Sequence, residues 1–181
     1  MTCKHVVAFI VGLSTLLAAP VEAAYGPGAM ILSANGGYMW FSDKQHLKNT
    51  GLYGAAIGYQ FTPAFSTQLQ ASYFYAAKTA RGGGSTTNGS IYTVNGIYHF
   101  FTHCKLRPFV LAGLGVSRIA HAPNNDPATL THFSGGVGGE LLMGDDASLS
   151  VSGRDNYTFT GGKQDLWVNI GLNFYLFGAK A

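Results

Sequence analysis

The sequence has few charged residues, almost no cysteine and no second long apolar run. Lysine, arginine, aspartate and glutamate make up 10% of the 181 residues, against roughly 25% in soluble domains. Beyond the N-terminal region no segment offers some twenty consecutive apolar residues, which excludes a membrane-spanning helix there. Of the 2 cysteines, Cys3 lies near the start, so Cys104 has no partner for an intrachain disulfide if the start is removed. The net charge of +3 is scattered without a basic run, so nucleic acid is not a predicted partner.

The N-terminus is typical of an export signal. Lys4 and His5 give a weakly basic start, and the apolar run 6–19 is too short for a comfortable transmembrane helix. Small residues then occupy the positions that a signal peptidase reads, so we predict cleavage after Ala23, with Ala24 as the alternative. The sequence therefore predicts a signal peptide at 1–23 and one mature domain at 24–181, with an uncleaved anchor as the competing interpretation.

Apolar residues and glycine are abundant. The chain is 47% hydrophobic and carries 25 Gly, 10 Tyr and 12 Phe. A chain that is apolar, poor in charge and without spanning helices has one other way to cross a membrane. It forms a closed β-barrel, in which every backbone polar group is paired and no sheet edge is left.

The stretch 165–178 shows the expected pattern most clearly. Its even positions are apolar without a break, and its odd positions mix small, polar and aromatic groups: Leu166, Val168, Ile170, Leu172, Phe174 and Leu176 against Trp167, Asn169, Gly171, Asn173 and Tyr175. Successive side chains of a strand point to opposite faces. The apolar face has about the height of a bilayer core for a tilted strand. This pattern predicts a membrane-spanning strand with lipid outside and a polar lumen inside.

Seven earlier segments alternate in the same way. The predicted strands are 29–41, 52–61, 65–76, 90–101, 107–119, 130–143 and 147–159. Longer polar loops at 42–50, 77–89, 120–129 and 160–164 alternate with short turns at 62–64, 102–106 and 144–146. This alternation is typical of bacterial transmembrane barrels, with short periplasmic turns and longer outer loops. We predict an all-β, eight-stranded antiparallel up-and-down transmembrane β-barrel that follows a cleaved signal peptide. Its interfacial aromatic girdles are predicted at Tyr38, Trp40, Tyr73, Tyr75, Tyr98, Trp167 and Tyr175.

Four stretches carry a family resemblance. At GLYGAAIGYQFT, RPFVLAGLGV, FSGGVGGELLMGDDASLSV and NIGLNFYLFG, the chain resembles the eight-stranded OmpA-type outer-membrane β-barrel family. The resemblance covers roughly 29–178, which is the barrel domain without the peptidoglycan-binding domain of larger relatives. It implies a bacterial outer-membrane location, surrounded by outer-membrane lipid and lipopolysaccharide. It also implies a terminal signal for the barrel-assembly machinery, carried here by Gly171, Leu172, Phe174 and Leu176, with Phe177 one place out of phase.

Charged side chains fall on the predicted lumen faces. Glu140 and Arg154 lie on neighbouring strands joined by the turn 144–146, so we predict a diagonal ion pair between them. The interior of an eight-stranded barrel is filled by its own side chains, and unpaired charges there are costly. The pair is interpreted as a structural plug. The alternative, which the family resemblance also suggests, is a gate that opens to pass small ions. The other lumen candidates are Gln68, Gln70, Asn95 and His132.

A catalytic alternative deserves comparison. His132-Phe133-Ser134 with Glu140 is similar in its His-x-Ser spacing to the outer-membrane lipid A deacylases, another small-barrel family. However, His132 and Glu140 lie eight residues apart along one strand, too far for a hydrogen bond. Gly135 also stands where that family has Asn, and the set faces inward, away from lipid. We therefore predict no catalytic residues. The 6 histidines show no ligand spacing, so neither a metal site nor a cofactor is predicted.

These observations predict a non-enzymatic outer-membrane barrel. It would serve envelope integrity or surface interaction, with host surfaces or phage as candidate ligands of its outer loops. The alternative is a narrow porin-like channel for ions or small solutes, gated by Glu140 and Arg154. A lipid A hydrolase ranks third. The sequence leaves the loop ligand and the oligomeric state open.

Overall fold

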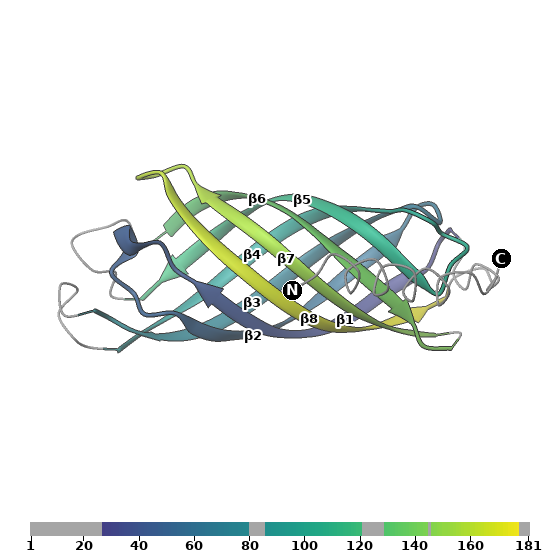
Figure 1. Ribbon diagram of the computed structural model, residues 1–181, viewed down its shortest axis with the longest axis horizontal. Coiled ribbons are helices and arrows are strands. Elements are labelled where there is room, and N and C mark those ends of the chain that lie inside the picture. Colours follow the sequence, from purple (N-terminus) through teal and green to yellow (C-terminus); the bar gives the residue numbers. More distant parts are fainter. Residues whose placement is uncertain (1–26, 80–85, 121–128, 145, 178–181) are drawn as a thin grey trace, which may run out of the picture.

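The computed structural model describes residues 27–79, 86–120, 129–144 and 146–177. These residues form one closed antiparallel barrel of eight strands in sequence order (Figure 1). The strands are β1 (Met30–Trp40), β2 (Thr50–Gln60), β3 (Phe65–Ala77), β4 (Thr86–His99), β5 (Leu106–Ile119), β6 (Thr129–Leu142), β7 (Ala147–Thr158) and β8 (Lys163–Leu176). One short 3-10 helix, η1 (Asp43–Gln45), follows β1. The predicted fold is confirmed, while the predicted signal peptide lies outside the described residues.

The last strand closes the barrel on the first. β8 pairs with β1 in a continuous antiparallel register from Met30↔Leu176 to Trp40↔Leu166. Closure satisfies the backbone groups that a free sheet edge would leave unpaired. Within the described ranges, no helix combines the length and the apolar character that a bilayer crossing requires.

The connections define two ends of the barrel. The short connections 61–64, 100–105 and 143–146 lie at the end where β1 begins and β8 finishes, which we call the turn end. The opposite end, which we call the loop end, holds the connections 41–49 and 159–162 and the strand ends at Ala77, Thr86, Ile119 and Thr129. The predicted alternation of short and long connections holds for the first six connections and is wrong for the last one, because 159–162 is shorter than 100–105.

The strand boundaries differ most from prediction at the start of β4. The polar stretch 86–89 was expected in a loop, but its residues pair with β3 from Phe74↔Gly89 to Ala77↔Thr86. The ladder thus continues past the apolar band, because backbone pairing does not require apolar side chains. At the C-terminal end of the barrel, β8 ends at Leu176, two residues before the end of the predicted stretch 165–178, and Phe177 adopts a φ of 60°.

The faces predicted for the stretch 165–178 agree with the structure. In β8 the even positions from Leu166 to Phe174 are exposed outward and the odd positions are buried. In β5 Val110, Leu114 and Val116 point outward, and Phe109, Leu111 and Gly113 face the lumen. The girdle prediction is wrong for two aromatics. Trp167 and Tyr175 are buried in the lumen, because they occupy odd positions of β8.

Outward aromatic pairs gather at both ends of the barrel. At the loop end the ring centroids of Tyr38 and Trp40 lie 4.9 Å apart. At the turn end Tyr59 and Phe61 lie 4.9 Å apart, and Tyr98 and Phe100 follow at 5.2 Å. An apolar band between two aromatic girdles is the exterior of a transmembrane barrel.

The lumen is layered along the barrel axis. An apolar cluster fills the loop end, made of Met39, Leu47, Leu52, Phe74, Ala76, Ile91, Ile119, Leu130 and Trp167. Polar side chains fill the middle and most of the turn end, where a smaller apolar group holds Ala29, Ile31, Leu142 and Tyr175. The prediction of a polar lumen is therefore correct for the middle of the barrel and wrong for its loop end.

Candidate functional site

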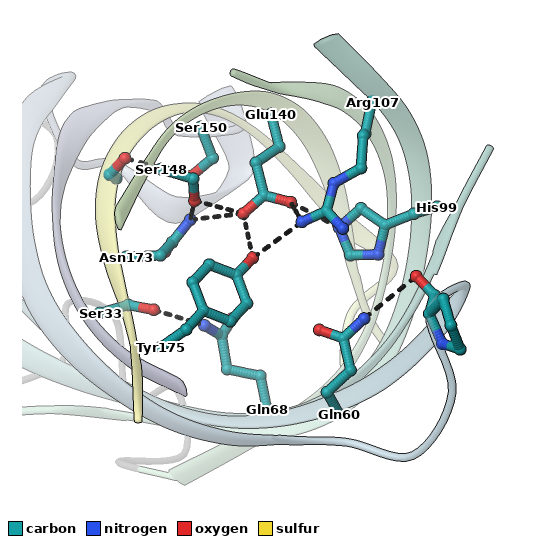
Figure 2. A network of polar contacts seen from close by, with 12 residues as sticks. Ser33, Gln60, Gln68, His99, Arg107, Glu140, Ser148, Ser150, Asn173 and Tyr175 are labelled. Atoms are coloured by element: carbon teal, nitrogen blue, oxygen red, sulfur yellow. Dashed lines mark hydrogen bonds and ion pairs between the residues drawn. The ribbon is translucent and has the colours of Figure 1, made fainter. Parts of the chain in front are cut away.

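The most connected polar group of the lumen is the carboxylate of Glu140. This side chain is 2% exposed and lies near the turn end of β6. Its Oε2 accepts a hydrogen bond from Nη2 of Arg107 at 2.8 Å and lies 3.0 Å from Nε2 of His99 (Figure 2). The two partners come from β5 and β4, so one oxygen of Glu140 ties three strands together.

The second oxygen of Glu140 faces β7 and β8. Nδ2 of Asn173 donates to Oε1 at 3.2 Å, and the hydroxyls of Ser148 and Tyr175 donate to the same oxygen (Figure 2). Arg107 also donates to the Tyr175 hydroxyl at 3.1 Å. A buried carboxylate is tolerated only with this degree of pairing and hydrogen bonding.

The predicted Glu140–Arg154 pair is wrong. Across the β6–β7 ladder Glu140 stands opposite Ser150, while Arg154 stands opposite Gly136, four residues farther along β6. That offset is about 13 Å at roughly 3.3 Å per residue. On the other side of β6, Arg107 stands directly opposite Glu140. Arg107 was not among the predicted lumen residues, although it lies in the predicted strand 107–119, whose odd positions 107–113 are buried in the structure.

A glycine in β6 makes room for this cluster. A Cβ built on Gly138 would lie 2.4 Å from Cζ of Phe109 and 2.5 Å from the carbonyl oxygen of Val151. The Phe109 ring therefore lies over Gly138, and its centroid is 5.5 Å from that of His99. The missing side chain of Gly138 thus leaves room for the Phe109 ring, which lies beside His99.

A second polar layer lies in the middle of the lumen around Gln70. Its Oε1 accepts from Nη1 of Arg154 at 2.7 Å and from Nδ2 of Asn95 at 3.5 Å. Its Nε2 donates to Asn35 Oδ1 at 3.3 Å and to Ser72 Oγ at 3.1 Å. Arg154 thus spans the lumen from β7 to β3, and the predicted candidates Gln70, Asn95 and Arg154 form one layer.

Gln68 lies on a neighbouring part of the wall. Its Nε2 donates to Ser33 Oγ at 2.9 Å, which links β3 to β1 (Figure 2). Together with the Glu140 cluster and Arg154, Gln68 lines a chamber of about 50 Å³ inside the barrel. A water molecule needs roughly 10–15 Å³ by the same measure, so the chamber holds only a few small molecules.

The predicted candidate His132 belongs to a different layer. Its Nδ1 lies 3.2 Å from Ser117 Oγ and its Nε2 lies 3.4 Å from Thr93 Oγ1. The ring is 6.4 Å, centroid to centroid, from Trp167 in the apolar cluster. Neither Ser134 nor Glu140 is among its hydrogen-bond partners in the described residues, so the structure assembles no acyl-transfer set there.

The connection after β1 folds over the loop end. Asp165 accepts from the Ser42 backbone nitrogen at 2.9 Å and from Gln45 Nε2 at 2.5 Å. Leu47 is buried in the apolar cluster, and it forms an isolated β-bridge with Lys78. The segment 42–47 is therefore fastened to β8 on one side and to the end of β3 on the other.

The predicted assembly signal has a mixed placement. Gly171 faces the lumen, and a Cβ there would lie 2.8 Å from Ser150 Oγ. Leu172 and Phe174 face outward, Leu176 is half-buried at the strand end, and Phe177 is 88% exposed beyond it. The role of these residues in assembly stays a prediction.

Two further sequence features have a plain structural description. Cys104 is a free, half-buried cysteine in the connection 100–105. In the described parts of the chain, no group of three or more His, Cys, Asp or Glu side chains is placed to hold a metal ion.

Comparison with known proteins gives consistent matches. The family model of the OprF membrane domain matches residues 1–180. The chain is 26% identical over 194 aligned residues to outer membrane porin F of Pseudomonas aeruginosa strain PAO1, covering 100% of this chain and 54% of that protein. This chain therefore spans about half the length of that relative.

Solved structures show the same fold. The N-terminal β-barrel domain of Pseudomonas aeruginosa OprF matches with a TM-score of 0.56 and 23% identity, over 82% of this chain and 99% of that one. Neisserial surface protein A matches with a TM-score of 0.60 and 16% identity, over 81% and 98%. Pseudomonas aeruginosa OprG matches with a TM-score of 0.63 and 12% identity, over 88% and 100%.

Proposed function

This chain belongs to the OprF membrane domain family, and from that premise we propose that it is a non-enzymatic structural protein of the bacterial outer membrane. The barrel anchors in the membrane through its apolar band and presents the loop end to the outside. In this function the lumen serves as a packed core, and its polar layers hold the strands together.

The observation that carries this proposal is the apolar cluster across the loop end of the lumen. Met39, Phe74 and Trp167 are each at most 3% exposed, and Leu47 of the folded-over connection packs among them. A close-packed apolar layer excludes water and ions, since a charge in such a layer is costly to desolvate. At the turn end the Glu140 cluster adds a layer of hydrogen-bonded side chains from β4, β5, β6, β7 and β8.

The partners follow from the exterior and from the loops. Outer-membrane lipid and lipopolysaccharide surround the apolar band in this proposal, and the barrel-assembly machinery reads the final strand. The loops at 42–50, 77–89, 120–129 and 160–164 supply the surface for host or phage ligands. Binding residues are commonly carried on loops held by a rigid scaffold, which supports this assignment.

Conductance in planar bilayers tests the closed lumen. Refolded wild-type protein is expected to show no steady single-channel steps. A Phe74→Ser/Trp167→Ser variant, which removes two large members of the apolar cluster, is expected to conduct. Steady conductance of the wild type equal to that of the variant would contradict the structural proposal.

The second candidate function is a narrow channel. The relative named outer membrane porin F and the polar chamber in the middle of the lumen both favour it. Passage then requires the segment 42–47 to leave the loop end and the Glu140 cluster to rearrange. The channel would be supported over the structural role if the wild type conducts and the Asp165→Ala variant, which releases Ser42 and Gln45, conducts more.

The enzymatic alternative has a separate test. Refolded protein incubated with lipopolysaccharide is expected to release no acyl chain. Release that disappears in a His132→Ala variant would favour the hydrolase instead.

A further inference from the structure

Arg154 is a buried cation without a carboxylate partner. It is 8% exposed, and its hydrogen bonds go to Gln70 at 2.7 Å and to Ser152 at 3.5 Å, both neutral groups. Its second terminal nitrogen, Nη2, has no acceptor among the described residues. A guanidinium stays charged in proteins, and a buried charge without a counter-charge is strongly unfavourable.

The buried carboxylates of the described lumen are already engaged elsewhere. Glu140 is paired with Arg107 and His99 near the turn end. Asp165 accepts from Ser42 and Gln45 at the loop end. The positive charge of Arg154 in the middle of the barrel therefore needs compensation from outside the chain.

The chamber next to Arg154 offers further hydrogen-bond donors. Asn169 lines the same chamber, is 3% exposed, and its side-chain nitrogen and oxygen have no partner among the described residues. Asn169 stands opposite Ser152 in the β7–β8 register, so the amide lies beside the hydroxyl that Arg154 contacts. Buried polar groups are normally hydrogen-bonded, so an unpaired amide beside the Arg154 guanidinium favours a polar ligand or ion in this chamber.

Two glycines create the space. A Cβ on Gly136 would lie 3.0 Å from Cγ of Arg154, and a Cβ on Gly37 would lie 2.8 Å from Oδ1 of Asn169. Both glycines sit on the lumen face directly opposite the residue that they accommodate. The chain thus leaves room for these two side chains at the edge of the chamber.

We propose that the lumen chamber binds a small monovalent inorganic anion, of the halide class, between Arg154 and Asn169. The guanidinium supplies the charge and the free Nη2 donor, and the amide of Asn169 supplies a second donor. The chamber of about 50 Å³ admits a halide and excludes a bulky organic anion. Water alone would satisfy the donors but would leave the charge uncompensated. The site does not depend on whether the barrel conducts.

Trp167 provides the reporter for the test. It stands directly opposite Arg154 in the β7–β8 register and is one of 2 tryptophans in the chain. Trp40, the other one, faces outward, so Trp40→Phe leaves Trp167 as the single indole. This protein is refolded into detergent micelles in iodide, a contact quencher, at constant ionic strength set with gluconate. Because iodide is present while the barrel forms, it can reach the lumen before the ends of the barrel close.

Saturable quenching of Trp167 by iodide, reversed by chloride, is the expected result. Arg154→Gln in the same background is expected to weaken iodide binding about tenfold or more, since a charge-assisted hydrogen bond is lost. Arg118→Gln, the same change at an exposed arginine outside the lumen, is the matched control and should leave the affinity unchanged.

Two results overturn the proposal. One is quenching that stays linear in iodide, and the other is equal saturable quenching in the Arg154→Gln variant. If that variant does not refold, crystals of the wild type grown in bromide decide the question. Anomalous scattering within contact distance of Arg154 supports the anion site, and a chamber that holds only water contradicts it.

Discussion

At the scale of single residues, the Glu140 carboxylate is where the lumen is most sensitive to change. Arg107 is 1% exposed and has its ion pair with Glu140. Removing one partner of a buried pair leaves an uncompensated charge, which costs about 3–5 kcal/mol. Glu140→Ala should therefore lower the free energy of unfolding by about that amount.

Urea unfolding in phospholipid vesicles, followed by tryptophan fluorescence, measures this cost. Tyr175→Phe is the graded comparison, because it removes one hydroxyl that donates to Glu140 and should cost less, about 1.5–3 kcal/mol. The double variant Arg107→Met/Glu140→Leu should recover most of the stability, since a hydrophobic pair replaces the ion pair. Equal midpoints for Glu140→Ala and the wild type would refute the assignment.

The ion pair also marks the limit of prediction from sequence at this scale. The alternation of β6 and β7 placed Glu140 and Arg154 correctly on the lumen face. The pairing was wrong because every strand has two neighbours and only the neighbour joined by a short turn has a register that can be counted. β5 joins β6 through the longer connection 120–128, so the pairing Arg107↔Glu140 was not predictable by counting from a turn.

At the scale of one element, β6 shows how glycine position decides packing. Gly138 faces the lumen beneath the Phe109 ring, and a Cβ there would meet Cζ at 2.4 Å. Its neighbour Gly139 faces the other side, where a Cβ would meet Leu106 Cδ1 at an ordinary 3.6 Å. Gly138→Ala should cost about 1–3 kcal/mol of overpacking strain, and Gly139→Ala should cost much less.

The two alanine variants form a matched pair, because they change adjacent residues of one strand by one methyl group. Urea midpoints in vesicles give the comparison. A larger loss for Gly139→Ala than for Gly138→Ala would show that the assigned faces of β6 are reversed.

The connection after β1 carries a prediction of its own. Asp165 fastens Ser42 and Gln45 to β8, so Asp165→Ala should release the segment 42–49. In protein that is folded in vesicles, trypsin is then expected to cut the variant at Lys44 and Lys48 several times faster than it cuts the wild type. Asp43→Ala, at an exposed position of the same connection, is the control. Equal cleavage rates in the two variants would mean that Asp165 does not hold the segment.

The sequence could not predict this fastening. The polar composition of 42–50 indicated an outer loop, which is correct for its place in the barrel. Leu47 and Gln45 are nevertheless buried, because they fill a lumen mouth that is formed by residues from seven different strands. Such contacts depend on how far each strand extends beyond the membrane, and alternation within one strand carries no information about that.

At the scale of the whole molecule, the two aromatic girdles mark the heights at which the outer face of the barrel meets the two surfaces of the bilayer. Val94 is 58% exposed and pairs across the sheet with Leu69 and Leu114, which are also exposed outward. These residues lie between the girdles, at the height of the bilayer core. Natural charges on the outer face, such as Arg118, lie near the loop end instead.

Arginine substitutions at two heights on the outer face test this placement. Val94→Arg should lower the free energy of unfolding in vesicles by about 2–4 kcal/mol, because the charge enters hydrocarbon near the midplane. Ala120→Arg, at an exposed site just past the loop end of β5, should cost about 0–1 kcal/mol. Urea titrations of both variants in vesicles of one lipid composition give the difference. Equal costs would place the bilayer elsewhere on the barrel, and a cost near zero for Val94→Arg would mean that this face does not meet lipid.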